Sequence, residues 1–187
     1  NDLWPYMRIG EEIIRTRAIP TTEFMTFTSF GQPAVYLFWL PSLIFLGIFK
    51  LGGPALMNVL SSLCIASFYL LLWLSLREHK IGYLTSGLLL LFSIITSIEA
   101  WSIRPQTLAF PLFGLVLLSI TKWQKGNNKL LWVLPLATLV WTNLHASFII
   151  VFLLAIPAIF FGSGNKKYLL IATVVAFVAT FVNYYGI

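Results

Sequence analysis

From Pro54 onward, charged side chains occur only in short connectors, and the stretches between these connectors are almost wholly apolar. The uncharged stretches span residues 54–76, 81–98, 106–121, 130–142, 147–162 and 168–182. A membrane-spanning helix needs about 20 mainly apolar residues, within a range of about 17–25. The first two stretches meet this requirement, whereas 130–142 is short and would cross only with help from its polar end. The pattern predicts an all-α, polytopic membrane protein whose residues 54–187 form a bundle of about six helices.

Composition excludes several classes of protein. The chain has 187 residues, of which 59% are hydrophobic and 10% charged, whereas soluble domains average about 45–50% apolar and about 25% charged residues. This excess of apolar residues argues against a soluble enzyme, a disordered segment and a nucleic-acid-binding protein, despite the net charge of +6. Cys64 is the single cysteine, so no disulfide framework is expected.

Lysines and arginines collect in alternate connectors of the predicted bundle. Connectors rich in Lys and Arg favour the cytoplasmic side of a membrane. The residues concerned are Arg77, Lys80, Lys122, Lys125, Lys129, Lys166 and Lys167. The connectors 99–105 and 143–146 and the chain at Asn183 would then face outward from a multi-pass membrane protein.

The first loop, residues 1–33, is polar and carries four acidic and three basic side chains. Its apolar spacing over 3–17 predicts a short amphipathic helix. The next apolar segment, 34–50, is followed by Leu51 and then by Gly52-Gly53-Pro54, which is a strong helix stop. We interpret 34–53 as a juxtamembrane interfacial helix and turn, which places the first loop on the outer face. If this segment crossed instead, the first loop would be cytoplasmic, and the charge pattern is compatible with both arrangements.

Arg104 is the first of two polar positions that the apolar surroundings do not explain. An ionisable group near the membrane is costly and marks a candidate site. The guanidinium of Arg104 offers a planar donor fork that suits a phosphate or carboxylate, and Pro105-Gln106 can begin the next helix. The alternative is an ion pair with Glu99 that anchors two helix ends.

His145 is the second position, in a connector without charge after Asn143. It could be a proton carrier, a phosphate donor, a metal ligand or a hydrogen-bonded structural residue. No second His or Cys stands at metal-ligand spacing, so a dedicated zinc site is not expected. An acidic first loop beside Arg104 on an outer face would suit an acid/base step on a lipid-phosphate substrate.

Several short motifs carry a resemblance to a known family. They are Asp2-Leu3-Trp4, Arg8-Ile9-Gly10-Glu11, Ile19-Pro20-Thr21-Thr22-Glu23, Arg104-Pro105-Gln106 and Asn143-Leu144-His145. Together they resemble a poorly characterised prokaryotic branch of the GT-C superfamily of integral-membrane glycosyltransferases. The run from Trp39 to Gly52 is similar to the juxtamembrane helix of the same fold. The likeness covers nearly the whole chain.

The resemblance implies a GT-C-like helical bundle that lacks its first helix, upstream of Asn1, and its last helices, beyond Ile187. It implies sugar transfer on the outer face of a prokaryotic inner membrane. The donor would be a polyprenyl-phosphate sugar held in the membrane lipid, and the acceptor a glycan, lipid or protein of the cell envelope. Asp2 matches the acidic residue that serves as catalytic base or metal ligand, so a divalent metal is possible but no cofactor is certain. The substrate-binding positions would be Arg8, Glu23, Arg104, Gln106, Asn143 and His145, with Arg104 on the donor phosphate.

The chain departs from the family pattern at Glu23, where Asp is usual, and at Phe38, where an acidic residue is frequent. A Gly that commonly follows the histidine is Ala146 here. The sequence leaves two other functions open. A lipid or solute transporter or flippase would place ionisable groups near the membrane midplane, and the predicted spans carry none. A non-catalytic membrane subunit would leave the acidic first loop unexplained.

Overall fold

The computed structural model describes residues 3–184 and 186, and regular structure in this part of the chain is helical. This confirms the all-α prediction for the described residues. The elements are α1 (Leu3–Thr16), α2 (Trp39–Glu78), α3 (Tyr83–Ser97), η1 (Ile98–Ala100), α4 (Pro105–Gln124), η2 (Asn128–Trp132), α5 (Val133–Trp141), η3 (Ala146–Ile149), α6 (Ile150–Phe161) and α7 (Lys166–Ala179). Thr22 and Pro33 form an isolated antiparallel bridge in the loop between α1 and α2.

A sharp kink divides α2 into two halves. Gly52 and Gly53 have non-helical backbone angles, and Gly53 has φ 58° and ψ −154°, a region that is open essentially only to glycine. Pro54 follows and begins the second half, because its fixed φ suits the first turn of a helix. The Gly-Gly-Pro motif therefore ends one helix and starts another, as the sequence predicts.

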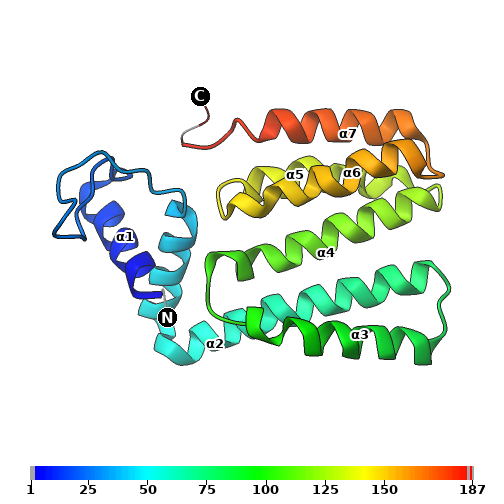
Figure 1. Ribbon diagram of the computed structural model, residues 1–187, viewed down its shortest axis with the longest axis horizontal. Coiled ribbons are helices and arrows are strands. Elements are labelled where there is room, and N and C mark those ends of the chain that lie inside the picture. The colour runs from blue at the N-terminus through cyan, green and yellow to red at the C-terminus, as the bar shows by residue number, and fades with distance from the viewer. Residues whose placement is uncertain (1–2, 185, 187) are drawn as a thin grey trace.

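The second half of α2 and the helices α3 to α7 run back and forth along the long axis of the molecule (Figure 1). The connectors consequently alternate between two ends of the bundle. One end carries 98–104, 142–146 and the chain after α7, and the other carries 79–82, 125–127 and 162–165. The Lys-rich connectors share the second end, which agrees with the alternation expected from sequence.

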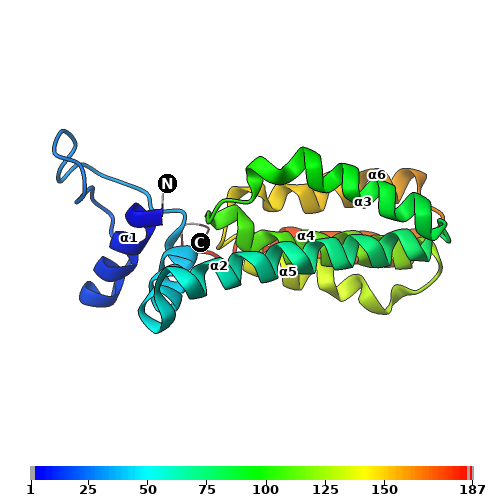
Figure 2. The same cartoon turned by 90° about the horizontal axis from the view of Figure 1, so that it is seen from below.

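Residues 3–51 form a separate layer, here called the head, at the first of these ends (Figure 2). Within the head, α1 packs along the first half of α2. The contact at Gly10 is close enough that an added Cβ would lie 2.5 Å from the carbonyl oxygen of Ser42. The apolar face of α1 buries Leu3, Met7 and Ile13 in this contact.

One hydrophobic cluster joins the head to the bundle. Leu3 and Met7 of α1 are buried against residues from both halves of α2, among them Phe45 and Met57. Ile103 of the connector before α4 packs against the same cluster. Burial of such side chains contributes about 1.5–3 kcal/mol each, so the cluster fixes the head beside the connector that carries Arg104.

Large apolar side chains cover the outside of the bundle. Among the described helices, α2 and α4 are long and apolar enough to cross a membrane. Apolar side chains are also exposed along α3 and α6, where Leu84 is 78% and Phe161 is 90% exposed. Soluble monomers rarely expose contiguous apolar surface on this scale. The surface therefore indicates that the protein associates with a membrane.

Candidate functional site

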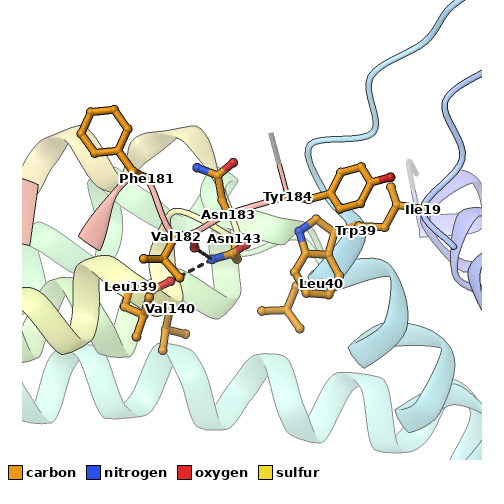
Figure 3. A pocket seen from close by; sticks show the side chains of 10 residues that line it. All are labelled: Ile19, Trp39, Leu40, Leu139, Val140, Asn143, Phe181, Val182, Asn183 and Tyr184. Carbon is orange, nitrogen blue, oxygen red and sulfur yellow. Dashed lines mark hydrogen bonds between the residues drawn. The ribbon is translucent and has the colours of Figure 1, made fainter. Parts of the chain in front are cut away.

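A cavity of about 520 Å³ lies between the head and the bundle end that faces it (Figure 3). Its lining is mostly apolar and comes from the head, α5 and the chain after α7. The lining residues are Ile19, Trp39, Leu40, Leu139, Val140, Asn143, Phe181, Val182, Asn183 and Tyr184. The cavity therefore depends on three segments that are far apart in the sequence.

Asn143 holds two of these segments together. Its Nδ2 donates to the carbonyl oxygens of Leu139 in α5 and Val182 beyond α7, each at 3.0 Å. Both bonds are drawn in Figure 3. The side chain of this predicted substrate-binding residue thus also has a structural role, because it pins the chain after α7 against the end of α5.

His145 lies two residues further on and is half-buried. It is the N-cap residue of η3, and its Nδ1 accepts the backbone N–H of Ser147 at 3.1 Å. The Oγ of Ser147 lies 2.8 Å from the same Nδ1 and accepts the indole N–H of Trp141 at 3.1 Å. Burial lowers the pKa of His145 below its usual range, which favours the neutral imidazole.

The head contacts His145 directly. The ring of Phe38, which is the N-cap residue of α2, stacks on the imidazole with centroids 5.6 Å apart. Phe38 also makes an edge-to-face contact with Tyr6 of α1, at 5.6 Å between centroids. The position where the resembling family often carries an acidic residue is therefore used here for aromatic packing between α1, α2 and the His145 connector.

Arg104 occupies the N-cap position of α4, and its side chain is exposed. The loop before it is held by Thr107, whose hydroxyl donates to the carbonyl oxygen of Ser102 at 2.7 Å. Pro105 is the first residue of α4, as the sequence predicts, and Gln106 follows in the first turn with a half-buried side chain. Because the N-terminal end of a helix favours anions, the location of Arg104 suits a phosphate.

The predicted residues of the first loop are placed differently. Asp2 lies outside the described residues. Arg8 is exposed and pairs with Glu11 of the same helix at 3.1 Å. It lines another cavity, of about 320 Å³, with Trp4 and Lys50. Arg8 does not line the cavity beside Asn143.

Glu23 uses its carboxylate within its own loop. Its Oε1 accepts the backbone N–H groups of Met25 at 2.6 Å and Thr26 at 3.0 Å. The bond from Met25 is the main reason why the pKa of Glu23 lies below its ordinary value, and bonds from Thr26 and Tyr36 act in the same direction. The geometry gives Glu23 a local turn-forming role, and its part in substrate binding stays a prediction.

The connectors 98–104 and 142–146 and the first turn of α4 lie at the end of the bundle that faces the head (Figure 1). They carry Arg104, Asn143, His145 and Gln106. The sequence reading missed Phe38, Ser147 and Tyr184 as parts of this region. A signal existed for Ser147, because a polar N-cap side chain accepts the N–H two or three residues later. Phe38 contacts His145 from a distant segment, and Tyr184 lines the cavity together with Trp39, so neither residue has a local sequence signal.

Within the part of the chain that the structure describes, no group of three or more His, Cys, Asp or Glu side chains could hold a metal ion. Comparisons with protein-family models, with curated proteins and with solved structures find no match to this chain.

Proposed function

We propose that this protein is a polytopic membrane glycosyltransferase of the GT-C type. It moves a sugar from a polyprenyl-phosphate donor to a glycan, lipid or protein acceptor on the extracytoplasmic face. The observation that carries the proposal is the packing of Leu3 and Ile103 in one cluster. Leu3 belongs to the first loop and Ile103 precedes Arg104, so the cluster supports a site in which the first loop works beside the Arg104 connector.

The apolar cavity supports a lipid-linked donor. Trp39, Leu40 and Val140 line it from opposite sides, and such a surface suits an isoprenoid chain because burial of apolar groups is favourable by about 0.8 kcal/mol per CH₂. Asn143 and Asn183 place amide groups among these apolar side chains. A ligand with an apolar tail and a polar head group matches that combination.

In the proposed reaction, the carboxylate of Asp2 accepts the proton of an acceptor hydroxyl. At the same time, the oxygen of that hydroxyl attacks the anomeric carbon of the sugar. The bond between that carbon and the phosphate oxygen breaks, and the lipid phosphate leaves with the electron pair. Arg104 and His145 stabilise the negative charge that develops on the leaving phosphate, which is an electrostatic contribution of the kind that dominates many enzymatic barriers. The transfer inverts the anomeric configuration.

The proposed membrane arrangement assigns the two ends of the bundle to opposite sides of the membrane. The end with Arg104 and His145 faces outward, and the end with the Lys-rich connectors lies in the cytoplasm. The uncharged stretches predicted from sequence then cross the membrane, with 34–53 along the outer surface. The packing of α1 on the first half of α2 supports a head that lies at the membrane surface. The apolar side chains of Leu3 and Met7 are buried within the protein, so α1 does not need to insert into the lipid.

The test is a mass profile of envelope glycans and lipid-linked sugars in cells that carry the native protein or Asp2→Asn. Glu12→Gln is the matched control, because Glu12 is an acidic residue of the same loop that pairs with Arg15 at 2.5 Å. We expect Asp2→Asn to lose a fixed sugar mass from one acceptor and to accumulate the lipid-linked donor, at equal membrane levels. A profile like that of the native protein would refute the role of Asp2 and favour transport or a structural function.

A further inference from the structure

The hydrogen bonds of His145 define which ring nitrogen carries a proton. The backbone N–H of Ser147 points at Nδ1 from 3.1 Å, and a backbone N–H can only donate. Nδ1 must therefore accept, which leaves the proton of the neutral imidazole on Nε2. This assignment follows from the partner and needs no observed hydrogen positions.

Trp141 determines how the hydroxyl of Ser147 is oriented. Its indole N–H donates to the Oγ of Ser147 at 3.1 Å, and an indole nitrogen cannot accept. The hydroxyl of Ser147 is then an acceptor on one side and can direct its hydrogen to Nδ1, 2.8 Å away. Trp141 is 2% exposed, so the hydrogen bonds that run from Trp141 through Ser147 to His145 begin at a side chain of the bundle core.

We propose that Trp141 and Ser147 hold His145 as a neutral imidazole whose Nε2–H is a fixed donor for a lipid-linked phosphate group. Ser147 and Trp141 are positioning residues, and the stacked ring of Phe38 restrains the plane of the imidazole. The identity of the ligand rests on the proposed function. The protonation pattern does not, because it follows from contacts within the protein.

This arrangement decides among the roles that the sequence left open for His145. A general base would need a free lone pair on Nε2, and the ring would then carry its proton on Nδ1, against the N–H of Ser147. The imidazolium form also carries a proton on Nδ1, which would point at the same backbone N–H of Ser147. Nδ1 is occupied, so it is not available as a metal ligand. Burial, which disfavours the charged ring, acts in the same direction as these bonds.

The first test is nitrogen NMR of the native protein with labelled histidine, in lipid nanodiscs at about pH 8, above the ordinary histidine pKa of about 6.5. His79→Gln serves as the background, because His79 is the other histidine and is exposed. We expect a single tautomer with Nδ1 unprotonated. Ser147→Ala keeps the backbone N–H at Nδ1 but loses the hydroxyl, so the Nδ1-unprotonated form should stay dominant and a minor signal from the Nδ1–H tautomer should appear. Ser147→Thr, which keeps the hydroxyl, should not show this minor signal. A protonated Nδ1 in the background protein would overturn the proposal.

The second test measures binding of farnesyl phosphate to the native protein, His145→Gln and His145→Phe. A Gln amide can donate an N–H but cannot act as a base, and Phe keeps a ring without nitrogen. Loss of a hydrogen bond to a charged group costs enough to weaken binding about ten- to hundredfold, so we expect that loss for Phe and a much smaller one for Gln. Equal binding by all three proteins, or none to the native protein, would overturn the assignment of the ligand.

The two tests separate the inference from the proposed function. A single Nδ1-unprotonated tautomer with phosphate binding, in a protein whose Asp2→Asn variant has an unchanged glycan profile, supports the inference and refutes the transferase. Loss of sugar transfer in Asp2→Asn with a protonated Nδ1 supports the transferase and refutes the inference.

Discussion

The ring of Phe38 lies against the imidazole of His145, with centroids 5.6 Å apart and planes inclined by 24°. This contact joins the N-terminal end of α2 to the connector between α5 and η3. The cluster around Leu3 and Met57 joins the head to the bundle at a second place. Between these contacts, the kink at Gly53 allows α2 to turn from the head into the bundle. The docked head completes the cavity, because Trp39 and Leu40 form one side of it.

Replacement of Phe38 by Ala should loosen the head. Aromatic pairs contribute about 0.5–1.5 kcal/mol beyond their buried area, and Phe38 contacts both Tyr6 and His145. We expect thermal unfolding in detergent at a midpoint lower by a few degrees, since about 1 kcal/mol corresponds to about 2–4 °C in a protein of this size. Cleavage by trypsin at Arg17 should become faster. Phe38→Tyr keeps both ring contacts and should behave like the native protein; equal loss in both variants would contradict this explanation.

Gly53→Ala should destabilise the protein, because a side chain is strained at φ 58° whatever the free space. The expected cost is about 1–3 kcal/mol, as for other residues in sparsely populated backbone regions. Gly47 provides the matched control, because it is helical and an added Cβ would meet nothing within 4 Å. Gly47→Ala should stabilise by about 0.5–1 kcal/mol through helix propensity. The unfolding midpoints of both variants check the prediction, and equal changes would show that the kink does not need glycine.

Stability should fall with pH below the ordinary histidine range because of His145. Its pKa in the folded protein is lowered from 6.5 by burial. The unfolded chain therefore binds more protons than the folded one as the pH falls through 6.5 towards the folded value, and stability decreases over that interval. In His145→Gln this part of the pH dependence should disappear. Unfolding midpoints measured between about pH 8 and about pH 5, around the ordinary histidine value, check it, and parallel curves for the two proteins would exclude His145 as the cause.

The sequence was informative where local chemistry decides the structure. Gly52-Gly53-Pro54 marks the kink in α2, and Pro105 marks the start of α4, because both motifs act through their own backbone. The predicted helix over 34–50 instead begins at Trp39. The residues before Trp39 form a loop in which the N–H of Ala34 donates to the carbonyl oxygen of Thr21. Helical periodicity does not reveal such a pairing between two segments.

The site itself was only partly predictable for a related reason. Arg104 and His145 stand out because polar groups are rare in an apolar chain. Their surroundings depend on long-range packing, such as the stacking of Phe38 on His145 and the bond from Asn143 to Val182. Glu23 resembles a site residue by motif, yet its carboxylate caps the turn at Met25. Such local use of a carboxylate becomes visible only when the loop geometry is known.

The orientation of the bundle can be tested with single cysteines at its two ends. Ala146, the first residue of η3, and His79, which follows α2, are both exposed and lie at opposite ends of the bundle. The native Cys64 is buried. Because the Lys-rich end is expected in the cytoplasm, a membrane-impermeant maleimide should label Ala146→Cys in intact cells. It should label His79→Cys only after the membrane is opened.

The native protein is the control for Cys64 and should stay unlabelled in both conditions. Labelling of His79→Cys but not Ala146→Cys in intact cells would reverse the orientation and place His145 on the cytoplasmic side. Labelling of both positions in intact cells would show that the bundle does not separate its two ends by a membrane. The predicted pattern would put the head and the cavity beside Asn143 on the outer face, which the proposed transfer from a lipid-linked donor to an envelope acceptor requires.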